Sequence, residues 1–161
     1  AGYVIDLRDS PGGLLDQVID VVDHFVAGGR VMVVRPYANC PDQESTDYNV
    51  RLGDETEGAR LVVLTNAETA SGAEMVAAAL RELRRATLVG QTTFGNARVH
   101  TVIPLQGGRD GVLKISTGVL TTPAGVTWDG AGLTPDLVTE PRTATADPTM
   151  DRAIAHLLAS P

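Results

Sequence analysis

The chain has 161 residues, 43% hydrophobic but only 4% aromatic, so Val, Leu, Ile and Ala must fill one compact core. Its formal net charge of −7 is spread along the chain, which argues against a nucleic-acid-binding protein. No apolar run approaches the roughly 20 residues that span a bilayer, and no charged-then-apolar leader opens the sequence. We therefore expect one domain over residues 1–161, without a membrane span.

A tight turn separates the first two predicted elements. An apolar stretch predicts a buried strand over residues 2–8, and periodic apolar residues predict a helix over 14–26. The turn between them contains Gly12 and Gly13, and consecutive glycines let backbone N–H groups face a ligand, as in one half of an oxyanion hole. The alternative interpretation is an ordinary strand-to-helix loop.

A second turn of the same kind follows the strand predicted over residues 61–66. Ser71 opens the next predicted helix, over 71–84, beside free N–H groups and the positive end of the helix dipole. Both features favour an oxyanion, so this placement suits a nucleophile. On this segment alone, a helix N-cap is the simpler interpretation. Two turns of this kind can face each other.

The remaining elements complete an alternating α/β pattern. Residues 37–59 are polar and predict a long loop with at most a short strand around 48–50. Asp147 and Pro148 provide the cap and first residue of a last helix. The other predicted elements are strands near 30–36, 86–90, 97–105, 111–122 and 126–128, and that helix near 148–159.

Five motifs lie in one register along the chain: Asp-Leu-Arg-Asp-Ser-Pro-Gly-Gly at 6–13, the segment 66–74, Gly-Gln-Thr-Thr-Phe-Gly at 90–95, the strand through 99–105, and Gly-Ala-Gly-Leu-Thr-Pro-Asp at 130–136. In order and spacing they resemble the C-terminal processing, or tail-specific, serine peptidases, over residues 2–158. The resemblance implies a crotonase-like α/β core related to the Clp peptidases, with mixed sheets packed against helices. It also implies a Ser–Lys dyad that cleaves near the C-termini of unfolded or tagged proteins, without a metal or organic cofactor.

The resemblance assigns the nucleophile to Ser71 and the oxyanion-hole amides to Gly72 and Gly12. The family's general base is a lysine directly after Thr-Phe-Gly, and this chain has Asn96 there. A glutamine four residues later orients that lysine, and this chain has His100 instead. Two of three catalytic positions therefore depart from the family.

A different base is needed, because a serine hydroxyl is a poor nucleophile until a neighbour takes its proton. The only lysine, Lys114, falls on a later predicted strand where the family tolerates a lysine, so we do not expect it to be the base. An asparagine amide cannot accept the proton either, whereas imidazole, which ordinarily titrates near about 6.5, can. On an extended strand Asn96 and His100 share a face, about 6.6 Å apart at roughly 3.3 Å per residue.

Two functions stay open on these residues. The first is a serine peptidase acting through Ser71, with His100 as a substitute base and Asn96 as its orienter, or acting only feebly. The second is a relative without catalysis that binds extended peptides at a sheet edge through backbone hydrogen bonds. An introduced change at Asn96 in an otherwise active enzyme is disfavoured, because position 100 departs as well.

Other reactive residues predict no further site. His24, His100 and His156 lie far apart in sequence and form no pair with metal-ligand spacing. Cys40 stands alone in a polar segment, which excludes an internal disulfide and gives no support to a thiol mechanism.

Arg81, Arg84 and Arg85 lie at the end of the helix predicted over 71–84, where cations complement the helix dipole, and they predict a structural role. By the resemblance, earlier strands, a helix and a PDZ domain would precede the strand near residue 2. Apolar surface left by their absence could be covered by a homo-oligomer. The family also implies work outside the cytoplasm, in a bacterial periplasm or cell envelope or a plastid lumen.

Overall fold

The computed structural model describes residues 2–38, 44–51 and 53–159, so Cys40 lies outside the described residues. Within these residues the strands form two sheets. The first is parallel, in the order β1 (Gly2–Asp6), β4 (Arg60–Thr65), β5 (Thr87–Gly90), β8 (Leu137–Val138). The second is antiparallel, in the order β3 (Thr46–Val50), β2 (Gly29–Pro36), β7 (Val112–Thr121), β6 (Arg98–Pro104).

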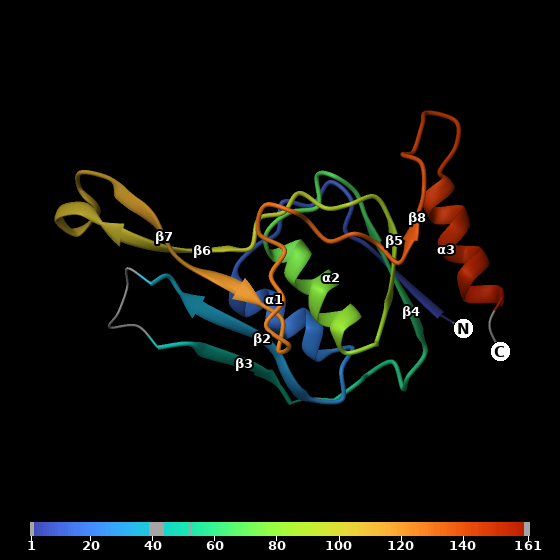
Figure 1. The fold of residues 1–161 in the computed structure, drawn as a ribbon, viewed down its shortest axis with the longest axis horizontal. Helices are drawn as coiled ribbons and strands as arrows, with labels where there is room; N and C mark the ends of the chain where they lie inside the picture. The colour runs from blue at the N-terminus through green and yellow to red at the C-terminus, as the bar shows by residue number, and fades with distance from the viewer. Residues whose placement is uncertain (1, 39–43, 52, 160–161) are drawn as a thin grey trace.

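Helices separate and cover these sheets. α1 (Leu15–Asp23) and α2 (Gly72–Glu82) lie between the two sheets, and α3 (Pro148–Ala159) covers the outer face of the parallel sheet (Figure 1). The four central residues of β4, Leu61 to Leu64, are all apolar because they contribute to both layers. Leu61 and Val63 pack into the core around α1 and α2, whereas Val62 and Leu64 pack against α3.

The predicted α/β fold, with mixed sheets packed against helices, is confirmed. The last helix begins where the sequence predicts, because Asp147 Oδ1 accepts the N–H of Met150 at 3.0 Å and so caps its first turn. Among the described residues, no helix has the length and hydropathy needed to cross a bilayer.

One element prediction is wrong. Residues 126–128 form no strand: Thr122 and Val126 close a tight turn through an N–H···O bond of 2.8 Å, and the buried Trp128 follows it. The short strand expected around 48–50 is confirmed as β3, which begins at Thr46 and pairs with β2. The two-residue strand β8 was not predicted.

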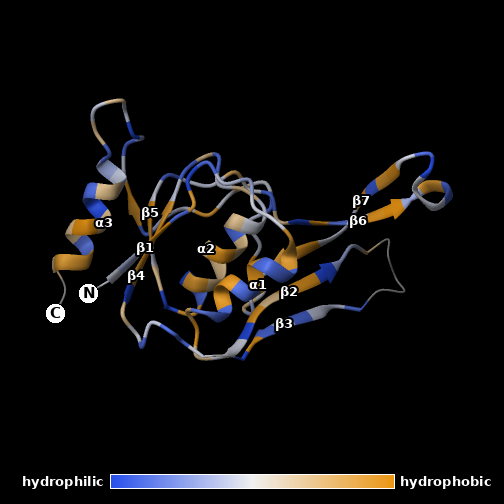
Figure 2. Cartoon of the chain, turned by 180° about the vertical axis from the view of Figure 1, so that it is seen from behind, coloured by the Kyte–Doolittle hydropathy of each residue, from blue (hydrophilic) through white to orange (hydrophobic). Residues whose placement is uncertain are grey.

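β6 and β7 form a hairpin that extends away from the helices, closed by the 3₁₀ turn Leu105–Gly108 (Figure 1). Both strands carry exposed apolar side chains, visible as hydrophobic stretches in Figure 2. They are Val102 and Ile103 on β6 and Val112, Leu113 and Ile115 on β7, and Leu105 in the turn between the strands is exposed as well. β6 is also an edge strand, so one row of its backbone groups has no partner strand among the described residues.

Candidate active site

The turn after β1 and the turn after β4 lie against each other. A Cβ on Gly12, whose φ is +86°, would stand 2.3 Å from the backbone nitrogen of Gly72, so only glycine fits there. The contact is fixed on one side by the Ala70 N–H, which donates to the Ser10 carbonyl at 2.9 Å. The structure therefore brings Gly12, Ser71 and Gly72 to one place, although they come from two separate strand-to-helix turns.

Ser71 has an unusual backbone conformation for the residue that precedes a helix. Its φ of 52° and ψ of −116° lie far from the extended conformation of an ordinary N-cap. A non-glycine residue held in such a region costs about 1–3 kcal/mol and persists only where its surroundings enforce it. A serine on a sharp, strained strand-to-helix turn is the geometry of a nucleophile elbow, which exposes the hydroxyl.

Glu74, one turn into α2, holds Ser71 in place. Its side chain is fully buried, and its Oε2 accepts the Ser71 N–H at 3.0 Å and the Asn96 N–H at 2.8 Å. Its Oε1 accepts the Gly95 N–H at 2.8 Å and the Thr93 hydroxyl at 2.5 Å. One carboxyl group thus connects the start of α2 to the loop at 93–96. The sequence analysis missed this role, although a Ser-x-x-Glu capping-box pattern at 71–74 could have indicated it.

The loop at 93–96 is in turn packed on the Gly-Ala-Gly-Leu turn at 130–133. Thr93 Oγ1 accepts the Leu133 N–H at 2.7 Å, so its hydroxyl bridges Glu74 and that turn. A Cβ on Gly95, at φ +92°, would lie 2.8 Å from the Gly132 nitrogen. These contacts bring the sequence motifs at 90–95 and 130–136 together. Gly95 and the Thr93 hydroxyl both pack against the turn at 130–133.

Ion pairs anchor the turn after β1 to α3. The Arg8 guanidinium, 6% exposed, donates to Asp147 at 2.7 and 2.8 Å and to Asp6 at 2.6 Å. These bonds from Arg8 hold the pKa of Asp147 below its usual value. Burial raises the pKa of Asp6, but the bonds and charge of Arg8 outweigh it, so that pKa is lowered as well. Arg142 pairs with Asp9 at 2.6 Å on the same turn.

The predicted base positions lie on or beside β6. Asn96 precedes the strand, and its Oδ1 accepts the Arg98 N–H at 3.3 Å. Asn96 and His100 line one cleft of about 300 Å³, beside the exposed ring of Phe94. His100 Nδ1 lies 3.1 Å from Ser116 Oγ on β7, directly across the strand pair.

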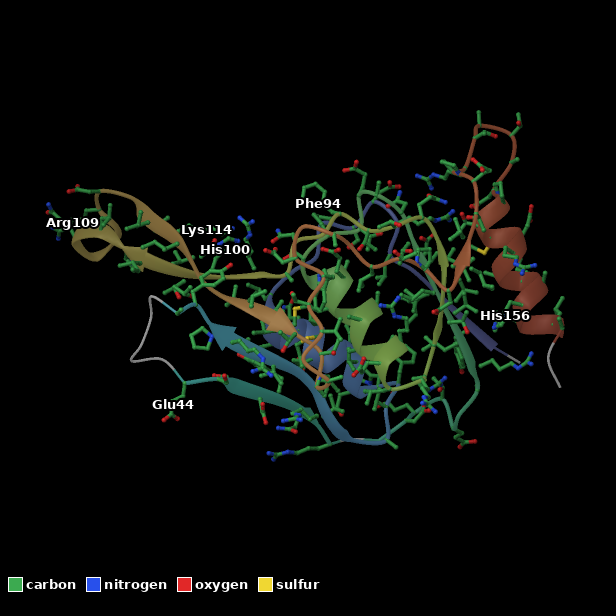
Figure 3. All side chains as sticks on the ribbon, viewed as in Figure 1. Glu44, Phe94, His100, Arg109, Lys114 and His156 are labelled. Carbon is green, nitrogen blue, oxygen red and sulfur yellow. The ribbon has the colours of Figure 1, made fainter. Side chains whose placement is uncertain are left out.

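Lys114 lies next to His100, which the sequence analysis did not anticipate. It faces Val102 across the strand pair, two residues along from His100 and Ser116, and Figure 3 shows both side chains at the hairpin. A cleft of about 490 Å³ is lined by Ser71, His100 and Lys114 together. Its walls are mainly apolar: Leu14, Leu15, Met75, Val99, Val102 and Leu120. No hydrogen bond joins Ser71 to either basic side chain in the part of the chain that the structure describes.

The arrangement offers a strained serine, free amides at a helix start and an imidazole in one largely apolar cleft. The Gly72 N–H belongs to the first helical residue and has no intrahelical partner, as the first four N–H groups of a helix do not. Such a set is suited to acyl transfer from a peptide carbonyl. The described residues bring no three His, Cys, Asp or Glu side chains close enough to hold a metal ion.

Comparison with known proteins agrees with this chemistry. The family model described as Peptidase family S41 matches residues 1–139. A carboxy-terminal-processing protease of Bartonella bacilliformis is 42% identical over 139 residues, which cover 86% of this chain and 31% of that protein. The carboxy-terminal processing protease CtpA of Bacillus subtilis is 36% identical over 129 residues, covering 80% and 25%.

Solved structures show the same fold. The photosystem II D1 C-terminal processing protease superposes with a TM-score of 0.78 at 30% identity, over 99% of this chain and 39% of that chain. The tricorn protease, at 20% identity and a TM-score of 0.58, shares the fold over 97% of this chain and 15% of its own. This chain spans between a quarter and a third of the length of these two relatives from Bartonella and Bacillus.

Proposed function

The chain belongs to peptidase family S41, and from this premise we propose that it hydrolyses peptide bonds in flexible, extended protein chains through an acyl-enzyme on Ser71. The relatives are named for C-terminal processing, which supports substrates cut near their C-termini. Relatives of this kind come from bacteria and from chloroplasts, and we place the activity outside the cytoplasm, in a periplasm, cell envelope or plastid lumen.

The observation that carries the proposal is the backbone of Ser71. Its conformation costs about 1–3 kcal/mol. It is enforced by the buried carboxyl group of Glu74 and by the close contact of Gly12 with the backbone nitrogen of Gly72. A protein that merely bound peptides would gain nothing from this strain at a serine. Retention of both the strain and the groups that enforce it supports chemistry at Ser71.

In the proposed mechanism, Ser71 Oγ attacks the peptide carbonyl carbon as a base removes its proton. The negative charge that develops on the carbonyl oxygen is stabilised by the N–H groups of Gly72 and Gly12. The same base then gives the proton to the leaving amine, and the C–N bond breaks to leave an ester on Ser71. Water, activated in the same way, hydrolyses this ester and restores the hydroxyl.

We assign the base to His100. In the tautomer whose Nδ1–H donates to Ser116 Oγ, Nε2 is the nitrogen that acts as the base. His100 shares a cleft with Ser71 but makes no hydrogen bond to it in the described structure, so the side chain must approach when substrate binds. Catalytic hydrogen bonds are often long before substrate binds, and such an approach is ordinary.

A second function is favoured by Asn96 alone. With an amide where the family has its lysine, the groove could bind an extended peptide without cutting it. β6 has an open edge and its residues line the cleft of Ser71, so a peptide could add to the sheet by backbone hydrogen bonds.

Degradation of casein, an unstructured protein, distinguishes the two functions. Micromolar protein should degrade casein, and Ser71→Ala should reduce the rate to background. If the two proteins are equally inactive and both bind a casein peptide with the same affinity, the binding function is correct and the peptidase proposal fails.

A further inference from the structure

A second cleft lies at the opposite end of α2 from Ser71. The helix spans Gly72–Glu82, so at 1.5 Å per residue the two ends are about 16 Å apart. This cleft has a volume of about 630 Å³ and is lined by Arg60, Arg81, Arg84, Arg85 and His156, which we call the arginine cleft. Figure 3 shows His156 on α3, far from His100 and Lys114.

The arginine cleft draws its cations from separate parts of the chain. Arg81 lies in the last turn of α2, and Arg84 and Arg85 follow the helix, but Arg60 begins β4 and His156 lies on α3. The sequence predicts that Arg81, Arg84 and Arg85 stabilise the C-terminal end of a helix dipole. This role does not explain why the Arg60 guanidinium, from a neighbouring strand, lines the same cleft. The fold concentrates positive charge here in a chain whose net charge is −7.

Most of this charge is not neutralised by carboxylates. Arg81 donates to the Thr134 carbonyl at 2.7 Å and Arg60 to the Leu157 carbonyl, so both are oriented by neutral groups. Arg84 is exposed, and its side chain has no hydrogen bond or ion pair within the described ranges. Arg85 is the exception, since it pairs with Asp54 at 2.8 Å.

The one carboxylate in the wall of the arginine cleft is already engaged. Asp136 Oδ2 accepts the Leu88 N–H at 2.8 Å, which fixes it against the start of β5. Arg60, Arg81 and Arg84 line the arginine cleft without forming an ion pair within 4.0 Å among the described residues, and each guanidinium has five N–H donors of which few are used.

We propose that the arginine cleft binds a phosphate dianion. Guanidinium groups match the oxygens of a phosphate in a planar, paired geometry, and they do so more effectively than ammonium groups. Arg81 and Arg60 are pre-oriented by their carbonyl contacts, so little side-chain entropy is lost on binding. Arg84 completes the site from the exposed side. The proposal is independent of catalysis at Ser71.

Calorimetric titration of the whole chain with inorganic phosphate, at constant ionic strength and pH 7.5, tests the site. We expect saturable binding of one phosphate. Arg84→Gln should weaken it by about tenfold or more, because a hydrogen bond between two charged groups is lost. Arg109→Gln, which removes an exposed charge at the distant hairpin tip of Figure 3, should leave it unchanged.

Binding that never saturates, or that falls equally in Arg84→Gln and Arg109→Gln, would overturn the proposal, because it would reflect net charge alone. Arg84→Gln should fold normally, since its side chain has no partner to lose among the described residues. Phosphate also stabilises folded proteins generally by exclusion from their surface. A rise in melting temperature therefore supports the site only if it is smaller in Arg84→Gln than in Arg109→Gln; equal rises count against it.

Discussion

Ser71 and Asn96 donate their backbone N–H groups to the same carboxylate oxygen, Oε2 of Glu74, at 3.0 and 2.8 Å. The proposed nucleophile, and the residue to which the resemblance assigns the position of the family's lysine, are thus held together through the backbone, whatever side chain stands at 96. We therefore expect the site to respond to changes at Glu74 and Asn96 in different ways.

Replacement of Glu74 by glutamine should destabilise the fold. The amide group can present only one oxygen to four donors, so backbone N–H groups at Ser71 or Gly95 lose their acceptor while buried. Each such loss costs about 1–3 kcal/mol. Urea unfolding should show a reduced free energy for Glu74→Gln and almost no change for Glu68→Gln, which is exposed. Equal stability of the two variants would show that the buried bonds are dispensable.

Replacement of Asn96 by lysine should create or increase cleavage. The backbone at 96 is already fixed beside Ser71, and a positioned general base contributes roughly 10²- to 10⁴-fold. In the His100→Ala background, casein degradation should therefore rise by about a hundredfold or more when Asn96→Lys is added. The double variant Asn96→Lys with Ser71→Ala controls for contaminating peptidases. No rise, with the fold intact, would mean that position 100 also must be restored.

His100 and Lys114 can be separated by paired variants. If His100 is the base, His100→Ala should abolish cleavage as fully as Ser71→Ala, whereas Lys114→Ala should change the rate by only a few-fold. Ser116→Ala, which removes the partner of Nδ1, should lower the turnover number more than the substrate affinity. Loss of activity in Lys114→Ala but not in His100→Ala would transfer the role to the lysine.

The requirement for glycine at position 12 can be tested by comparing alanine substitutions at positions 12 and 13. Gly12→Ala introduces a Cβ that would meet the Gly72 nitrogen at 2.3 Å, in a backbone with φ of +86°. It should cost more than about 1 kcal/mol of folding free energy and displace an amide of the proposed oxyanion hole. Gly13→Ala is the matched control, because its Cβ would have no atom within 4 Å. Thermal unfolding of both variants measures the difference, and equal melting temperatures would contradict it.

The ion pairs of Arg8 predict acid sensitivity. Bonds from Arg8 lower the pKa of Asp147 in the folded state, so the pair stabilises the fold above the ordinary carboxyl pKa, about 3.9. This stability is lost as the pH falls through the lowered folded-state pKa. The free energy of unfolding should therefore drop less between about pH 4 and 2 in Asp147→Asn than in the unmodified chain. Asp151→Asn, an exposed change in the same helix, should keep the full drop.

Much of the fold follows from local patterns, and the misses have physical causes. Long apolar runs such as β4 and the cap at Asp147 are decided within a few residues. β8 has two residues and exists only because β5 offers an edge, which no local pattern reveals. Trp128 lies in an apolar stretch but is buried by a turn, since the chain reverses at Thr122 before any strand can pair.

The candidate site divides in the same way. Ser71 and the glycine turn are visible in sequence, because each follows a buried strand and begins a helix. The position of Lys114 beside His100 depends on strand register, and the buried contacts of Glu74 depend on a loop far along the chain. Arg60 is distant in sequence from Arg81, Arg84 and Arg85 and lines the same cleft only in the folded chain. The sequence therefore predicted a role in capping the helix but not the cleft.

The projecting hairpin also governs how copies of this chain behave in concentrated solution. It presents apolar side chains next to an open strand edge, the combination most prone to pair with another chain. What keeps copies apart is the net charge of −7, whose reach falls from about 30 Å at 0.01 M salt to about 8 Å at 0.15 M. Electrostatic repulsion between copies therefore weakens as salt is added, while the apolar strand edge stays equally able to pair.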